Sequence, residues 1–280
     1  MFREIGLVSR LDSEDALKLA AEIHRFLSSK RLAIFPEAEF ARLGRLRGGR
    51  RFSEMDVDLI ITVGGDGTVL KTSMLIPRPD TPILAVNMGR RGYLAEVQPE
   101  DAIKAIQNCL EGKYRLEENV KLSVSLDDKQ LADGLNEVLI APTLPSKVLR
   151  FNMKLGGNPF LRSGGDGLIV ATPTGSTAHA LSAGGPILDP SLEAFVVVLI
   201  CPVEPIRPVV IPAERNLEFR LTDAGSKATV VIDGRYQKDL SPRSSVKIGR
   251  SKHKAVFVRF ANNRLGRSLM RFQAPERKIT

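Results

Sequence analysis

The sequence has few of the residues that build disulfide scaffolds and zinc sites. Its 280 residues include no tryptophan, three histidines and two cysteines, Cys109 and Cys201. Two isolated thiols show no pairing pattern, which indicates a reducing compartment. The scattered histidines and cysteines also lack the spacing of a zinc site. We therefore expect a cytoplasmic protein and assign no histidine or cysteine as a metal ligand.

Long hydrophobic runs are also absent. The longest, residues 194–203, is about half as long as a membrane-spanning helix. Near the N-terminus, Glu4 stands where a signal peptide has a basic and then an apolar stretch. Hydrophobic residues still make up 43% of the chain, which is enough to form a core. These features favour a globular protein with no membrane partner.

Acidic residues are outnumbered by basic ones, 32 against 41, and the net charge is +9. Five arginines fall within residues 42–51 without an acid, and residues 250–280 contain nine basic residues and one acid, Glu276. Such stretches are typical of solvated surfaces, or of a face that binds polyphosphate or nucleic acid. Composition does not decide between these. The first stretch is also rich in glycine, which predicts a mobile loop that could close over a phosphate donor.

Strand and helix patterns alternate over residues 1–112. Four apolar segments are typical of strands: residues 5–9, 31–35, 59–63 and 83–86. After a candidate N-cap at Asp12 or Ser13, apolar residues follow at helical spacing: Ala16, Ala20, Ile23 and Leu27. A second helical face over residues 102–110 ends at Gly112. This alternation predicts an N-terminal α/β, Rossmann-like domain with a parallel sheet.

After Gly112 short strand patterns recur between Gly, Pro, Asp and Ser residues. They cover residues 122–126, 138–141, 168–171, 195–200, 217–221, 229–232, 246–248 and 255–259, with one helix at 177–183. This pattern is typical of an antiparallel sandwich or barrel. We expect a C-terminal antiparallel β-sandwich domain over residues 113–260. Residues 261–280 form a basic C-terminal segment that could pack back on the N-terminal domain.

The turn Gly64-Gly65-Asp66-Gly67-Thr68 follows the predicted buried strand 59–63. Ligands bind at the carboxyl ends of strands in open α/β sheets, and glycines let phosphates approach the backbone. A carboxylate there would repel phosphates, so Asp66 is a candidate proton acceptor or metal ligand. The alternative is an ordinary Asp-Gly turn.

A second turn, Gly164-Gly165-Asp166-Gly167, precedes the predicted strand 168–171. Hydroxyl residues then surround Gly175 before the short predicted helix. A helix start of this kind offers free N–H groups and the positive end of a dipole, which suit an anion or a sugar hydroxyl. An ordinary capped helix is the alternative.

Four segments in this order resemble the NAD kinase family. They are residues 64–68, residues 87–94 (Asn-Met-Gly-Arg-Arg-Gly-Tyr-Leu), Asn136-Glu137, and residues 165–186. The first segment is shared with lipid kinases of the same superfamily, whereas the last is more specific. The resemblance implies that the terminal phosphoryl group of ATP is transferred to the adenosine-ribose 2′-hydroxyl of NAD, giving NADP.

The resemblance also implies roles for individual residues. Asp66 matches the proton acceptor, which would orient the 2′-hydroxyl and take its proton. The candidate ligand-binding residues are Gly65, Gly67, Thr68, Lys71, Asn87, Asn136, Glu137, Lys147, Asp166, Thr174, Thr177, Ala178, His179, Ala180, Leu181, Ser182 and Arg235. His179 departs from the family pattern, which usually has tyrosine at this position.

The implied substrates are NAD as acceptor and ATP as donor, with polyphosphate as another donor to test. Mg²⁺ or another divalent cation is the implied cofactor, and a homodimer or homotetramer is the implied assembly. We expect no nucleic-acid partner. Two alternatives remain: a diacylglycerol- or sphingosine-type lipid kinase of the same superfamily, and a non-catalytic regulator that binds nucleotides or nucleic acids through the basic stretches.

Overall fold

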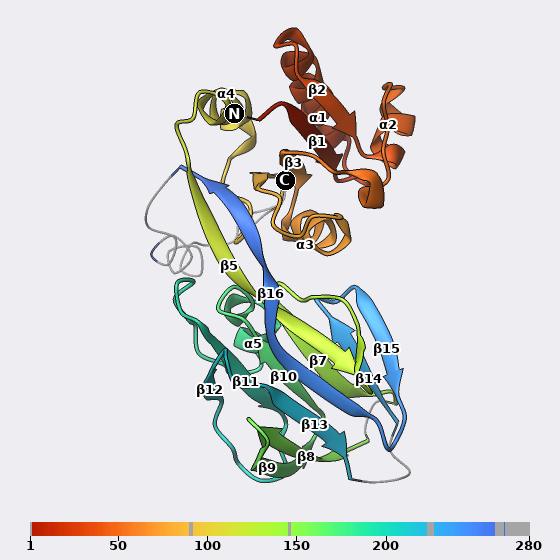
Figure 1. Ribbon diagram of the computed structural model, residues 1–280, viewed down its shortest axis with the longest axis vertical. Helices are drawn as coiled ribbons and strands as arrows, with labels where there is room; N and C mark the ends of the chain where they lie inside the picture. The colour runs from red at the N-terminus through yellow and green to blue at the C-terminus, as the bar shows by residue number, and fades with distance from the viewer. Residues whose placement is uncertain (1, 90–91, 145–146, 223–226, 261–265, 267–280) are drawn as a thin grey trace, which may run out of the picture. The chain divides into compact units, whose positions relative to one another are not determined.

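The computed structural model describes residues 2–89, 92–144, 147–222, 227–260 and 266 (Figure 1). The chain divides into two compact units. Unit 1 comprises residues 1–118 and the chain from residue 255 onward, and unit 2 comprises residues 119–254. We expected boundaries at 112/113 and 260/261, and the two units divide at 118/119 and 254/255. Apart from Gly266, the expected basic segment 261–280 lies outside the described residues.

Unit 1 contains a parallel sheet with the strand order β2-β1-β3-β4-β16. The strands are β1 (Glu4–Ser9), β2 (Ala33–Pro36), β3 (Leu59–Gly64), β4 (Ile83–Asn87) and β16 (Ser245–Arg259). The residues of β3 and β4 are buried throughout, as expected for a parallel sheet covered on both faces. The predicted parallel α/β domain is confirmed.

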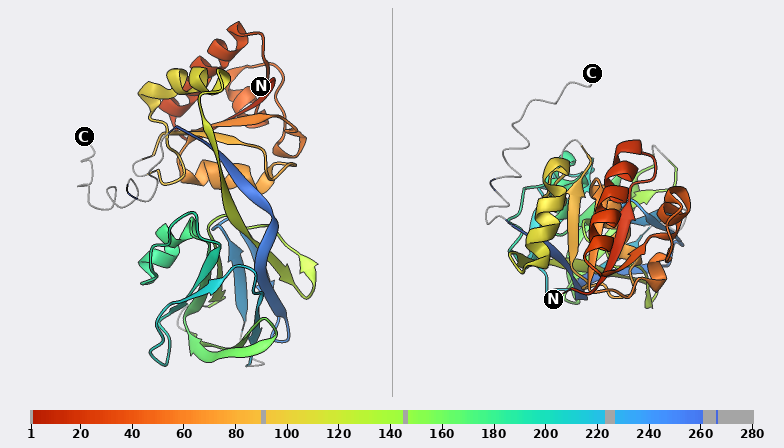
Figure 2. Two further views of the ribbon diagram at one scale, coloured as in Figure 1. Left: turned by 60° about the vertical axis from the view of Figure 1, so that its left-hand side comes forward. Right: turned by 90° about the horizontal axis from the view of Figure 1, so that it is seen from above.

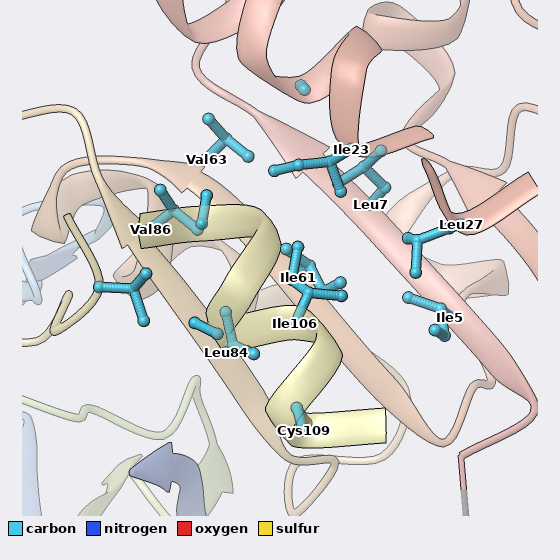
Figure 3. Packing of buried hydrophobic residues seen from close by; sticks show 14 of the residues in the cluster. Ile5, Leu7, Ile23, Leu27, Ile61, Val63, Leu84, Val86, Ile106 and Cys109 are labelled. Carbon is cyan, nitrogen blue, oxygen red and sulfur yellow. The ribbon is translucent and has the colours of Figure 1, made fainter. Parts of the chain in front are cut away.

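Three helices cover the sheet of unit 1: α1 (Glu14–Ser29), α3 (Asp66–Leu75) and α4 (Ala102–Leu110). Figure 2 shows α1 and α4 on one face of the strands and α3 on the other. Alternate strand residues such as Ile5, Leu7 and Ile61 pack with α1 and α4 in one core cluster (Figure 3). Ser13 caps α1 by accepting the N–H of Ala16, and the predicted apolar face is the buried one.

The arginine-rich stretch is not the continuous loop that we expected. Residues 42–44 of the stretch belong to helix α2 (Ala38–Gly44). Two short 3₁₀ helices of unit 1, η1 (Phe52–Glu54) and η2 (Pro99–Asp101), lie beyond the stretch. Buried Phe40 anchors α2 in the core, which is a packing effect that the local Arg and Gly content conceals. The Arg50 guanidinium lies 3.3 Å from the centroid of the Phe35 ring.

Unit 2 contains a six-stranded antiparallel sheet with the order β12-β11-β10-β7-β14-β15. Its strands are β7 (Glu137–Pro142), β10 (Gly167–Ala171), β11 (Ala194–Ile200), β12 (Val209–Pro212), β14 (Ala228–Ile232) and β15 (Tyr236–Leu240). All five residues of β10 are buried, so both faces of the sheet are covered there. The 3₁₀ helix η3 (Gly175–Thr177) and α5 (His179–Ser182) follow β10.

A second set of strands in unit 2 pairs in the order β16-β13-β8-β9, all antiparallel. The strands are β8 (Leu149–Leu155), β9 (Asn158–Gly165) and β13 (Leu217–Leu221), while β5 (Arg115–Leu126) pairs with β16 and β6 (Lys129–Gln130). Buried and exposed residues alternate along β8, which is typical of a strand with one solvated face. The expected antiparallel β-rich domain is confirmed.

Several strand predictions were incomplete. The segments 246–248 and 255–259 are parts of one strand, β16. We did not predict β8, β9, β12 and β15. β9 contains a proline and β15 is polar, whereas β8 has an alternating pattern that was present in the sequence. In the described part of the chain, no helix combines the length and the hydrophobicity needed to cross a membrane.

Candidate active site

Asp66 begins α3 at the point where β3 ends. Gly65 is the N-cap residue of α3, so the carboxylate lies beside the helix N-terminus at the carboxyl edge of the parallel sheet. Gly64 pairs with Asn87 on the adjacent strand. A Cβ atom on Gly64 would lie 2.2 Å from the Thr68 hydroxyl oxygen, so the turn requires glycine at that position. The first predicted motif therefore meets the second at this edge.

The carboxylate of Asp66 is held by backbone amides from the second motif. Its Oδ2 accepts the N–H of Tyr93 at 2.9 Å. Its Oδ1 accepts the N–H of Leu94 at 2.9 Å and that of Ala95 at 3.4 Å. The side chain is half-buried, and Oδ2, with a single N–H donor, keeps a position for another donor.

The segment that supplies these amides is anchored on Asn87. Asn87 is 5% exposed, and its Oδ1 accepts the N–H of Gly89 at 3.0 Å. Gly92 has a φ of +46°, and a Cβ atom there would lie 2.5 Å from the Asn87 side chain. Only glycine adopts this φ readily and leaves room for the Asn87 side chain. Arg90 and Arg91 of this motif lie outside the described residues.

The other predicted ligand residues of unit 1 surround this turn. Gly65, Thr68 and Lys71 are half-buried, and Gly67 is exposed. The Nζ atom of Lys71 lies 5.1 Å from the centroid of the Phe52 ring, one turn along α3 from Gly67. The structure thus places this part of the predicted site in one region of unit 1.

In unit 2 a second cluster forms where β7 begins and β10 ends. The carbonyl of Asn136 accepts the N–H of Thr172 at 2.9 Å, and the hydroxyl of Thr172 donates to the Leu135 carbonyl at 2.6 Å. A Cβ atom on Gly175 would lie 2.0 Å from the Asn136 carbonyl oxygen. The Asn136-Glu137 pair and the Thr172–Ser176 segment are therefore packed against each other.

Asp233 holds this cluster from the turn that follows β14. Its Oδ2 accepts the N–H of Leu135 at 2.7 Å, and its Oδ1 accepts those of Asn136 at 2.8 Å and Glu137 at 3.0 Å. Burial raises the pKa of Asp233, and the three amides and the Lys121 ammonium oppose this effect. Lys121 is 2% exposed, and its pKa is lowered by burial.

Two polar atoms of this cluster lack a hydrogen-bond partner among the residues that the structure describes. Within the described part of the chain, Oδ1 of Asn136 and Oε2 of Glu137 are buried and take part in no hydrogen bond. Burial, together with the nearby negative charge of Asp233, raises the pKa of Glu137 to about 7. Buried acceptors without partners are costly, so a ligand with hydroxyl or amino donors would satisfy them.

The predicted helix 177–183 is shorter than expected. It consists of η3 and the four-residue α5, separated at Ala178, which has non-helical backbone angles. It therefore provides little of the helix dipole that we expected. The Thr174 hydroxyl instead donates to Asn119 Oδ1 at 3.1 Å. Exposure differs along the segment: His179 and Ser182 are exposed, Thr177, Ala178 and Leu181 are half-buried, and Thr174 and Ala180 are buried.

Three predicted residues lie elsewhere in unit 2. Asp166 and Thr172 flank β10, so a strand of about 17 Å separates Asp166 from the Asn136 cluster. Exposed Lys147 follows the far end of β7 from Glu137. Exposed Arg235 lies two residues after Asp233, in the turn between β14 and β15. Among the described residues, no three His, Cys, Asp or Glu side chains are grouped closely enough to hold a metal ion.

Two family models cover most of the chain. The ATP-NAD kinase N-terminal domain matches residues 5–114, and the ATP-NAD kinase C-terminal domain matches residues 135–260. The chain is also 38% identical over 262 residues to an NAD kinase of Methanothermobacter thermautotrophicus, with 92% of each chain covered. This chain belongs to the NAD kinase family. The predicted family resemblance is confirmed.

Another curated relative and two solved structures are also similar to this chain. An NAD kinase of Thermococcus gammatolerans is 39% identical over 265 residues, which cover 92% of this chain and 94% of the relative. A crystal structure of an NAD kinase from Archaeoglobus fulgidus in complex with ATP superimposes with a TM-score of 0.77 and 27% identity, covering 96% and 98% of the chains. The yeast NADH kinase, at 20% identity and a TM-score of 0.87, shares the fold and covers 99% and 90%.

The residues that hold the NAD kinase motifs in place were not predicted from the sequence. The amides of residues 93–95 act through the backbone, which carries no side-chain signature. Asp233 precedes Gly234 in a turn where both residues have positive φ, and this Asp-Gly signal was available in the sequence. Buried Lys121 had no such signal, because its burial depends on Asp133 and Asp233.

Proposed function

We propose that the chain transfers the terminal phosphoryl group of ATP to the 2′-hydroxyl of the adenosine ribose of NAD. The observation that carries this proposal is the Asp66 carboxylate, held by the amides of Tyr93 and Leu94 at the carboxyl edge of the sheet. Membership of the NAD kinase family supplies the substrates. The product is NADP, with ADP as leaving group.

Asp66 acts as the proton acceptor in this reaction. The 2′-oxygen forms a bond to the γ-phosphorus, the bond from that phosphorus to the β,γ-bridging oxygen breaks, and the hydroxyl proton moves to Asp66. Oδ2 is the atom we assign, because it receives one N–H and Oδ1 receives two. A positioned base of this kind contributes about 10²–10⁴-fold to the rate.

The cluster of unit 2 binds NAD. The unpartnered Glu137 Oε2 accepts a hydroxyl hydrogen, and the amide of Asn136 offers both donors and an acceptor. Backbone amides of the first glycine turn suit the phosphates of ATP. Mg²⁺ enters as part of the ATP substrate, because this ion is commonly held by phosphates with only one or two carboxylates.

Replacing Asp66 with asparagine tests the assignment. Asp66→Asn keeps the shape of the side chain and removes the base, so kcat for NADP formation falls at least about 10²-fold while the NAD dissociation constant changes little. Asp56→Asn, at an exposed carboxylate paired with Arg78, is the matched control. Wild-type turnover by Asp66→Asn would remove this residue from the role. The same assay on the unmodified protein compares NAD with NADH as phosphoryl acceptor and ATP with polyphosphate as donor.

We also propose self-association as a dimer or tetramer. β12 is an edge strand of the six-stranded sheet, and its Val210 is 47% exposed. Nearby in sequence, Val203 is 52% exposed. Edge strands with apolar side chains tend to be covered by another chain. Light scattering after size exclusion gives the mass, and a monomer at micromolar concentration would contradict the proposal.

A cytoplasmic location is proposed from the cysteines. Both Cys109 and Cys201 are free thiols. Burial raises the pKa of Cys109 to about 12, so it stays in the unreactive thiol form, whereas Cys201 is exposed. Cell fractionation tests this location, and recovery of the protein from an oxidising compartment would contradict it.

A further inference from the structure

Arg259 is a buried charged residue near the end of β16. Only 2% of the residue is exposed, although the sequence placed it in a basic stretch expected to face solvent or an anion. An arginine loses much hydration on burial, so its partners must replace those interactions. The identity of those partners indicates what this residue does.

The Arg259 side chain contacts three segments of unit 1. Its Nε donates to Oε1 of Glu117 at 3.2 Å and lies 3.7 Å from Oε2 of Glu96. Its guanidinium carbon lies 4.7 Å from the centroid of the Phe257 ring. Its Nη1 donates to the carbonyl oxygen of Leu94 at 2.8 Å. The Arg259 side chain therefore contacts β5, β16 and the segment that follows Gly92.

The Leu94 carbonyl belongs to the same peptide group as the N–H of Ala95. That N–H points to Oδ1 of Asp66 at 3.4 Å, and the N–H of Leu94 donates to the same oxygen at 2.9 Å. We propose that Arg259 is a positioning residue for Asp66, which holds and polarises the peptide whose amide faces the carboxylate. Hydrogen bonds in series strengthen one another in a buried setting. This inference rests on the proposed role of Asp66 as proton acceptor.

Loss of Arg259 would affect catalysis by changing the orientation of the Asp66 carboxylate. Asp66 keeps the orientation of Oδ2 only while the amides of residues 93–95 stay in place. If that segment shifts, the carboxylate turns with it, and a displacement of about 1 Å at a reacting group can cost about 10²-fold in rate. Substrate binding depends on other groups. Loss of Arg259 therefore lowers kcat much more than it raises either KM.

Arg259→Lys is the informative variant. The lysine keeps the positive charge beside Glu117 and Glu96, but its single ammonium cannot reproduce the planar fork that contacts Leu94 as well. We expect kcat to fall at least about tenfold with the KM for NAD and ATP within about threefold. Leu27→Ala, in the α1 core of the same unit, is the control for loss of stability. It should leave kcat near wild type at temperatures where both variants are folded.

A double-variant measurement separates positioning from a general structural role. In the Asp66→Asn background, Arg259→Lys should cause little further loss of kcat, because the group it positions is no longer a base. The inference would be overturned if Arg259→Lys lowered kcat by the same factor in both backgrounds, or if Leu27→Ala lowered kcat as much. The proposed function would stand in either case. Normal turnover by Asp66→Asn alone would overturn both.

Discussion

The carboxylate of Asp233 holds the backbone of Glu137, although 96 residues separate them along the chain. The two side chains are thereby placed close together in a buried setting. Burial and the Asp233 charge raise the pKa of Glu137 to about 7, well above the ordinary value of 4.5. This relationship predicts that the proposed NAD-binding cluster responds to pH in the neutral range.

The stability of the protein should fall as Glu137 ionises. The folded state holds this proton more tightly than the unfolded state, so protonation of Glu137 adds to the free energy of unfolding. This added stability is fully present below pH 4.5 and is lost as the pH rises through about 7. The loss is at most about 3 kcal/mol of the free energy of unfolding. Chemical denaturation at pH 5 and pH 8 measures it, with Glu137→Gln as control. Equal pH slopes for the two proteins would contradict the assignment.

Binding of NAD should show the opposite trend. An ionised Glu137 accepts a ligand hydroxyl better than a protonated one, so the dissociation constant should decrease between pH 6 and pH 8. Calorimetric titration of NAD measures this change. Glu137→Gln should bind more weakly at pH 8 and show a flat profile. A wild-type profile that is flat across this range would show that Glu137 does not contact NAD as a carboxylate.

Asp233→Asn should destabilise the protein strongly. The substitution removes a negative charge near buried Lys121. It also replaces one carboxylate oxygen by an NH2 group, so a backbone N–H that Asp233 holds loses its acceptor. Leaving a buried N–H without an acceptor costs about 1–3 kcal/mol. Thermal denaturation measures the effect. Asp128→Asn, at an exposed residue paired with Lys247, is the matched control and should melt close to the wild type. Similar melting of the two variants would contradict the role of Asp233.

Gly92→Ala should impair catalysis, whereas Gly112→Ala should not. Both glycines have positive φ, +46° and +77°, so alanine is strained at either position by about 1–2 kcal/mol. Only at Gly92 would the new Cβ atom collide with Asn87, since nothing lies within 4 Å of it at Gly112. The collision displaces the amides that hold Asp66, and kcat should fall at least about tenfold. Equal kcat values in steady-state assays of the two variants would contradict this.

Local patterns in the sequence determined much of the fold. The face of α1 and its Ser13 cap were predicted because side-chain spacing and capping depend on neighbours along the chain. The same holds for β3 and for the turn that carries Asp66, where a buried strand precedes glycines. β15 was missed because its polar residues face solvent in a sheet whose existence depends on distant partners, whereas β8 alternates apolar and polar residues and could have been recognised.

Tertiary structure alone decided which charges are buried and what they hold. Lys121 and Arg259 look like surface residues in the sequence, yet they are 2% exposed because carboxylates from distant segments compensate their charge. Asp66 was identified by its motif, but the backbone amides that orient it come from a segment 27 to 29 residues later. Local composition specifies backbone conformation and exposure preference, whereas pairing across long sequence distances is set only when the chain packs.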